Sequence, residues 1–165
     1  MTPSPDQWSG GCLCKSVRYT LRGQPTYFAI CHCSNCKKFS GSAFMDVAFY
    51  RPEDYIINSG KEYMKQYIDR ETGSGLTVIR TFCSNCGSSL SLKMETDERI
   101  LVNGGTIDGK FDWIPTMEIF VENRRKFVPI LCRPVPEVVD ANEVVIPTPE
   151  DSSTSTGHVS PIRPS

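Results

Sequence analysis

Seven of the eight cysteines in this chain fall into three short clusters. They read Cys12-Leu-Cys14, then Cys31-His-Cys33-Ser-Asn-Cys36, then Cys83-Ser-Asn-Cys86-Gly. Thiolates at such spacings hold zinc in a tetrahedron, with each sulfur about 2.3 Å from the ion. A C-x-x-C turn brings two sulfurs to one point, and a C-x-C on a strand puts both side chains on one face. The sequence therefore predicts that all seven cysteines bind metal.

Seven ligands are too many for one tetrahedral ion, so we expect two ions. The triple cluster of Cys31, Cys33 and Cys36 could form a three-cysteine site unaided. The pairs Cys12/Cys14 and Cys83/Cys86 would then complete one closed four-cysteine site. Structural zinc sites are closed, whereas catalytic ones keep three protein ligands and an open position. The triple cluster is therefore the candidate catalytic site.

Two alternatives remain open at this point. Both ions could be structural, with His32 or a distant group filling the fourth position at the triple cluster. His32 lies between two ligands, so on an extended backbone it is expected to point away, either into solvent or into a hydrogen bond. Iron could also occupy a site of four thiolates in place of zinc.

Other uses of the cysteines fit the sequence less well. A secreted disulfide framework is disfavoured, because residues 1–7 are polar and Pro-rich and are not expected to form a signal peptide. The chain is expected to be cytoplasmic, where disulfides are disfavoured. Cys132 stands alone among apolar neighbours and is expected to be a buried free thiol. A methionine sulfoxide reductase combines a closed zinc site with a separate nucleophilic cysteine. In this chain only Cys132 is left to be that nucleophile, so this function is disfavoured.

The elements that position these cysteines are expected to be mainly β-strands. Apolar residues alternate with polar ones in several stretches, as half-buried strands require. The predicted strands are Val17–Leu21, Ala43–Tyr50, Glu62–Ile68, Leu76–Phe82, Ser89–Met94, Arg99–Asn103 and Met117–Glu122. Helix is expected only as a turn or two after Cys36 and a short turn at Pro52–Tyr55, where Pro suits a first helical position.

The length and net charge of the chain limit the classes of protein to which it can belong. A chain of 165 residues favours one domain. We expect an extension at 1–9, a zinc-binding domain at 10–133 and a disordered Pro/Ser/Thr-rich tail at 134–165, because that tail has too few apolar residues to offset its ordering entropy. A net charge of −1 lacks the basic surplus of a nucleic-acid-binding protein. No apolar run approaches the length of a membrane span, so no membrane partner is expected.

The three cysteine motifs together resemble a known family. GGCLCKSVRY, CHCSNCKKFSGSAF and RTFCSNCGSSL resemble the glutathione-dependent formaldehyde-activating enzymes, a family that includes centromere protein V. The resemblance covers residues 10–127. It implies a zinc-tethered β-tent of antiparallel sheets. It also implies a structural zinc at Cys12, Cys14, Cys83 and Cys86, and a second, catalytic zinc at Cys31, Cys33 and Cys36.

The resemblance also implies an activity, the condensation of formaldehyde with glutathione to S-(hydroxymethyl)glutathione, which is carbon–sulfur lyase chemistry in the synthetic direction. Lys37, Lys38 and Arg80 are the cations expected to bind the substrate carboxylates and to offset the thiolate charge. Asp108, Glu118 and His32 are proton-transfer candidates by residue type. Glu118 stands where family members often have histidine, and Phe127 where they have tryptophan.

Two alternative functions follow from the same residues. The protein could form or cleave a carbon–sulfur bond in another glutathione adduct, in specialised metabolism. It could instead be a zinc-stabilised binding module without chemistry. A protein ligand at the fourth position of the second zinc would favour the binding module, whereas water or an exogenous thiol there would favour the enzyme.

Overall fold

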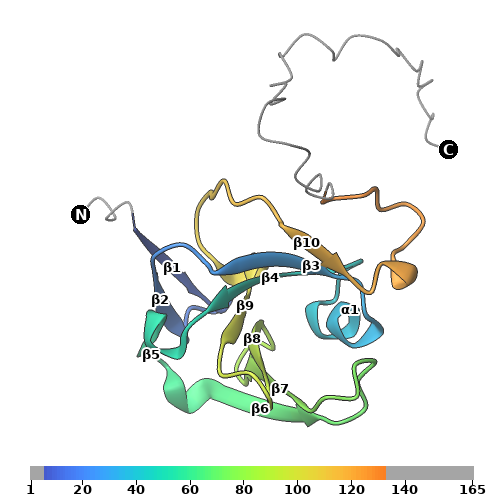
Figure 1. Ribbon diagram of the computed structural model, residues 1–165. Coiled ribbons are helices and arrows are strands. Elements are labelled where there is room, and N and C mark those ends of the chain that lie inside the picture. Colours follow the sequence, from blue (N-terminus) through green and yellow to red (C-terminus); the bar gives the residue numbers. More distant parts are fainter. Residues whose placement is uncertain (1–5, 133–165) are drawn as a thin grey trace, which may run out of the picture. The chain divides into compact units, whose positions relative to one another are not determined.

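The structure, a computed structural model, describes residues 6–132. Within these residues the fold is mainly β, with ten strands in two sheets and one α-helix (Figure 1). The smaller sheet is antiparallel in the order β1-β2-β5. Its strands are β1 (Gln7–Gly11), β2 (Arg18–Arg22) and β5 (Tyr55–Ser59).

The larger sheet has seven strands in the order β10-β3-β4-β9-β8-β7-β6. They are β3 (Tyr27–Cys31), β4 (Met45–Tyr50), β6 (Met64–Asp69), β7 (Val78–Cys83), β8 (Ser89–Met94), β9 (Ile100–Asn103) and β10 (Met117–Ile119). The helix α1 (Ser34–Ser40) follows β3 directly. Short 3₁₀ turns at Pro52–Asp54, Lys61–Tyr63, Gly104–Thr106 and Val121–Asn123 connect the strands.

The expected mainly β, single-domain fold is confirmed, with one correction to the expectation of purely antiparallel sheets. β10 pairs parallel with β3, and Glu118 lies opposite Ile30. A parallel neighbour needs a long crossover connection, which the intervening strands and loops supply. The expected tail at 134–165 lies outside the described residues. Among residues 6–132, no helix has the length and apolarity needed to cross a membrane.

Two apolar cores lie in this fold, and each surrounds one of the cysteine groups. The first includes Cys12 and Cys83 and is built from residues such as Tyr19, Leu21, Leu90 and Val102. The second includes Cys31 and Cys36, and its other members are Ala29, Met45, Val47, Phe49, Val78, Leu92 and Leu101. The packing therefore holds the two cysteine groups in separate parts of the molecule.

Candidate metal centres and active site

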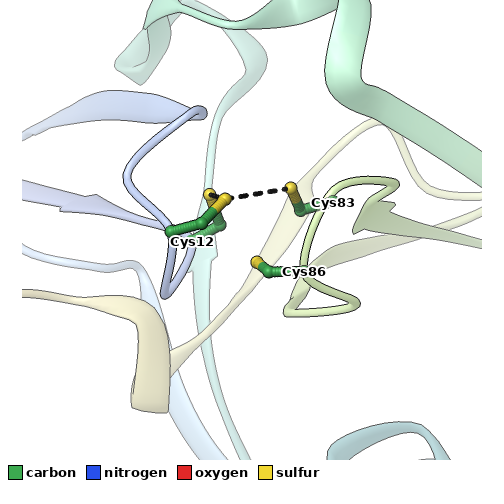
Figure 2. Close-up of side chains that lie close together, drawn as sticks. Cys12, Cys83 and Cys86 are labelled. Carbon is green, nitrogen blue, oxygen red and sulfur yellow. Dashed lines mark hydrogen bonds between the residues drawn. The ribbon is translucent and has the colours of Figure 1, made fainter.

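The first centre joins two turns that are far apart in the sequence. Cys12 and Cys14 lie in the turn between β1 and β2, while Cys83 ends β7 and Cys86 lies in the turn before β8. Figure 2 shows the sulfurs of Cys12, Cys83 and Cys86 directed toward one another from these turns. The four Sγ atoms lie within 4.8 Å of one another. The smaller and larger sheets are thus brought together at this group, which we call the four-cysteine cluster.

The local backbone explains why these sulfurs converge. The expectation that Cys12 and Cys14 lie on a strand is wrong, because they occupy a tight turn in which Lys15 has a positive φ of 64° and its N–H donates to the Cys12 carbonyl. On the other side, the Gly87 N–H donates to the Cys83 carbonyl, and Gly87 has a φ of 74°. Each turn thus contains one residue in the left-handed conformation, which bends the backbone around the two sulfurs of that turn. Glycine adopts this conformation without steric cost.

The donor set and spacing of the four-cysteine cluster fit zinc. Tetrahedral ligation at about 2.3 Å per sulfur places the sulfurs about 3.8 Å apart. The Cys12–Cys14 and Cys14–Cys83 Sγ separations are 3.4 Å and 3.9 Å, and none of these cysteines forms a disulfide. Hydrogen bonding by Ser16 lowers the pKa of the exposed Cys14 thiol to about 5, which favours the thiolate that binds metal. The cluster could therefore hold a metal ion.

The second centre is the triple cluster. Cys31 ends β3, Cys33 is the N-cap residue of α1, and Cys36 lies in its first turn. Their Sγ atoms lie within 4.8 Å of one another, and the Cys36 N–H donates to Cys33 Sγ at 3.3 Å. Hydrogen bonds from Cys31 and Cys36 lower the pKa of the Cys33 thiol, whereas hydrogen bonds with Cys33 and Cys36 raise the pKa of the Cys31 thiol. The cluster thus favours one thiolate shared among three sulfurs even without an ion, and the sulfur donors fit zinc.

Nothing in residues 6–132 adds a fourth histidine, cysteine or carboxylate ligand to the triple cluster. His32 is fully buried, and its Nε2 lies 3.2 Å from Glu118 Oε1. Its ring thus faces away from the sulfurs, as the extended backbone predicted, and it makes the expected hydrogen bond rather than contacting solvent. The three sulfurs instead form part of the wall of a cavity.

Of the three cations expected to bind substrate, Arg80 contacts the triple cluster through its guanidinium. Its NH1 is 3.8 Å from Cys36 Sγ, and its Nε donates to Asp69 at 2.8 Å. Lys38 and Arg80 both line a second, more polar cavity of about 380 Å³. Lys37 is directed elsewhere, because its Nζ donates to the Asn123 carbonyl at 2.7 Å. Substrate binding by Lys37 therefore remains a prediction, which the direction of its side chain does not support.

The proton-transfer candidates lie away from the cavity that holds the three sulfurs. Asp108 binds Arg18 and accepts from the Ser9 hydroxyl at 2.9 Å, and Arg18 lowers the pKa of this carboxyl. Glu118 is engaged with His32, Arg124 and the backbone of Leu131. Neither of these carboxylates nor His32 lines that cavity. Cys132 is a buried free thiol, as expected, and burial raises its pKa.

The sequence reasoning missed the partner of Arg80. Asp69 ends β6, is buried, and accepts both from Arg80 and from the Asn35 side-chain amide at 2.8 Å. Burial raises the pKa of the Asp69 carboxyl, but the hydrogen bonds from Asn35 and Arg80 outweigh that effect and lower it overall. Asp69 thereby fixes Arg80 beside Cys36, and Asn35 ties the same carboxylate to α1.

Comparison with known proteins shows the family to which the chain belongs. The model of the glutathione-dependent formaldehyde-activating enzyme family matches residues 7–123. The chain belongs to this family. The match includes all seven clustered cysteines but stops before Cys132.

Individual relatives are distant. A putative glutathione-dependent formaldehyde-activating enzyme of Halomonas elongata is 33% identical over 82 residues, which are 49% of this chain and 52% of the relative. An uncharacterized lyase of Schizosaccharomyces pombe is 27% identical over 84 residues, 51% of this chain and 56% of the relative. The aligned stretches thus span about half the length of these curated relatives. A crystal structure of a Rhodobacter sphaeroides protein superposes with a TM-score of 0.48 at 21% identity, covering 63% of this chain and 91% of that one.

Proposed function

We propose that this protein is a zinc-dependent carbon–sulfur lyase that acts on glutathione adducts. One zinc would be structural at the four-cysteine cluster, and one catalytic at the triple cluster. The observation that carries the proposal is that three sulfurs without a fourth protein ligand, among the described residues, face a cavity. An open position is what a catalytic zinc requires. Family membership and the lyase named among the relatives support the same reaction class.

The reaction itself is a simple exchange of bonds. In the cleavage direction the bond between sulfur and the hydroxyl-bearing carbon breaks, and its electron pair stays on sulfur. The hydroxyl proton leaves as the carbonyl forms. When bound at the triple cluster, zinc would lower the pKa of a thiol at its open position and so stabilise sulfur as a leaving group.

The chain's own side chains would bind and orient the adduct. Arg80, held by Asp69, places a positive charge 3.8 Å from Cys36 Sγ and would offset the negative charge of the gathered thiolates. Lys38, at the polar cavity, is positioned to attract a glutathione carboxylate. Because Asp108, Glu118 and His32 are engaged elsewhere, we assign the proton to water or to the released thiolate.

The test is a pair of cysteine variants assayed for turnover of S-(hydroxymethyl)glutathione. Cys33→Ser is expected to remain folded, to keep one zinc and to lose activity by at least about a hundredfold. Cys132→Ser removes a buried cysteine outside both clusters and is expected to keep two zincs and activity. If Cys33→Ser unfolds outright, the triple cluster is structural and the proposed division is wrong. A folded protein with two zincs but no turnover of any adduct would favour the binding-module alternative.

A further inference from the structure

The cavity beside the triple cluster is apolar. It measures about 110 Å³, and Cys31, Cys33 and Cys36 contribute to its wall. Most of the remaining wall is hydrocarbon from five strands of the larger sheet, β4, β7, β8, β9 and β10, and from the residue after β10, comprising Val47, Val78, Leu92, Leu101, Ile119 and Phe120. Among residues 6–132, Arg80 is the one charged residue that lines it, and that guanidinium is already bonded to Asp69.

This cavity is poorly matched to formaldehyde alone. The adduct of formaldehyde carries a single carbon and a hydroxyl, which would leave most of the space unfilled and the apolar wall uncovered. An apolar protein cavity of about 150 Å³ accommodates a benzene molecule. By that measure 110 Å³ suits an apolar group of about four or five carbon atoms.

The polar half of a glutathione adduct has a different place to bind. The more polar cavity of about 380 Å³ is lined by Asn35, Lys38, Asp69, Glu71 and Arg80 among others. Arg80 lines both cavities, so both border this side chain beside Cys36. The tripeptide would lie in the polar cavity, the sulfur at the cysteines, and the substituent in the apolar cavity.

Phe120 closes the apolar cavity in an unfavourable backbone conformation. Its φ and ψ are 56° and 45°, in the left-handed region that bulky residues rarely adopt. Its ring lies against Gly73, since a Cβ built there would be 3.5 Å from Phe120 Cε1. Strain of this kind persists at ligand-binding sites where the surroundings hold it. An aromatic wall is thus kept at a position where glycine would be the easier residue.

We propose that the substrates are glutathione adducts whose sulfur-bearing carbon carries an apolar substituent of about four or five carbon atoms. The hemithioacetal of a branched aliphatic aldehyde belongs to this class. This inference rests on the proposed function. In cleavage the carbon–sulfur bond breaks with its electrons going to sulfur, the hydroxyl proton passes to the released thiolate to give the thiol, and the aldehyde leaves. No oxidant or reductant is needed.

The test is calorimetric binding of two stable thioethers to the full, zinc-loaded chain. S-Butylglutathione extends S-methylglutathione by three methylenes, and each fully buried methylene is worth roughly fourfold in affinity. We expect the butyl compound to bind at least about tenfold more tightly. Equal affinities would overturn the inference while leaving the proposed function intact, whereas no binding of either thioether would overturn both.

Two glycine variants distinguish the effect of the Phe120 ring on binding from the effect of relieving a positive φ. Phe120→Gly removes the ring and relieves the positive φ, and we expect it to abolish most of the butyl preference while the protein stays folded. Lys15→Gly relieves a similar positive φ of 64° away from the cavity and should leave the preference unchanged. A Phe120→Gly protein that keeps the full preference would contradict the proposed binding mode.

Turnover rates test the same substrate preference independently of the binding measurements. Exchange rates measured by NMR for the glutathione hemithioacetals of formaldehyde and of 3-methylbutanal are expected to favour the larger aldehyde in kcat/KM by about tenfold. Turnover of the formaldehyde adduct alone would confirm lyase activity and overturn this inference.

Discussion

Glu118 connects three parts of the chain next to the triple cluster. Its carboxylate oxygens accept from His32 Nε2 at 3.2 Å, from Arg124 NH2 at 2.7 Å and from the Leu131 N–H at 3.2 Å. The side chain is only 5% exposed. Because His32 lies between two proposed ligands, this carboxylate fixes the backbone from which their sulfurs project.

Replacing Glu118 by glutamine keeps the shape of the side chain and removes its charge. Arg124 would lose its ionic partner, and one donor of the new amide would face another donor. We expect Glu118→Gln to lower the free energy of unfolding by about 1–3 kcal/mol in denaturant titrations. The matched control is Glu53→Gln, which removes an exposed partner of Arg51 and should change stability by less than about 0.5 kcal/mol. Equal effects of the two variants would contradict this account.

Ionisation of the Glu118 carboxyl group makes the stability of the protein depend on pH. Burial raises the pKa of Glu118, but the hydrogen bonds from His32 and Leu131 and the charge of Arg124 lower it overall, below the usual 4.5. A lowered folded-state pKa contributes stability above pH 4.5 that is lost as the pH falls through the folded-state value. The stability difference between the native protein and Glu118→Gln should therefore shrink between about pH 6 and pH 3. Urea titrations across this range that give a constant difference would be inconsistent with an ionised Glu118.

At the scale of elements, the C-terminus of α1 depends on a single glycine. Gly41 has a φ of 65°, and its N–H donates to the Lys37 carbonyl, which closes the helix that presents Cys36. Gly41→Ala should cost about 1 kcal/mol of unfolding free energy, because alanine is strained in this conformation. Gly105→Ala is the control, since Gly105 lacks a positive φ and an added Cβ there would meet only Asn103 Oδ1 at 3.5 Å. Thermal denaturation of the two variants checks the difference, and equal losses would contradict it.

Alternation of polar and apolar residues predicts the half-buried strands well and the others poorly. The predicted strand Ser89–Met94 coincides with β8. β3 was missed because Phe28 to Cys31 are all buried and show no alternation. β1 was missed because Ser9, Gly10 and Gly11 carry little strand signal, although pairing with β2 orders them. In both cases the segment forms a strand because of its tertiary packing, which the local sequence pattern does not reveal.

At the scale of the whole molecule, the proposed structural zinc would join the two sheets. Cys14 is exposed, so Cys14→Ser removes a ligand without disturbing a core. Metal binding at such a site is coupled to folding, and the stability of a whole domain is only about 5–15 kcal/mol. We expect Cys14→Ser to lower the melting temperature by more than about 10 °C. A strong chelator should lower the melting temperature of the native protein by more than that of the variant, which has already lost the metal at this cluster; a chelator that has no effect on the native protein would count against a metal at this cluster.

The grouping of the cysteines could be predicted from ligand number, but the cavities could not. Asp69 and Arg80 meet because β6 and β7 pair Asp69 with Val78 and Tyr67 with Arg80, which makes the two charged residues diagonal neighbours on one face. That register depends on the turn between the strands. The apolar cavity likewise gathers residues from β4, β7, β8 and β9, and no local pattern marks them as a shared wall.

The central claim is that the triple cluster binds zinc with a position open to a thiol. It is tested most directly by measuring zinc content and glutathione binding together in the native protein and in Cys33→Ser. The account predicts two zincs and one bound glutathione per native chain, and one zinc with no glutathione binding in the variant. A single zinc in the native chain, or glutathione binding unchanged in Cys33→Ser, would contradict it.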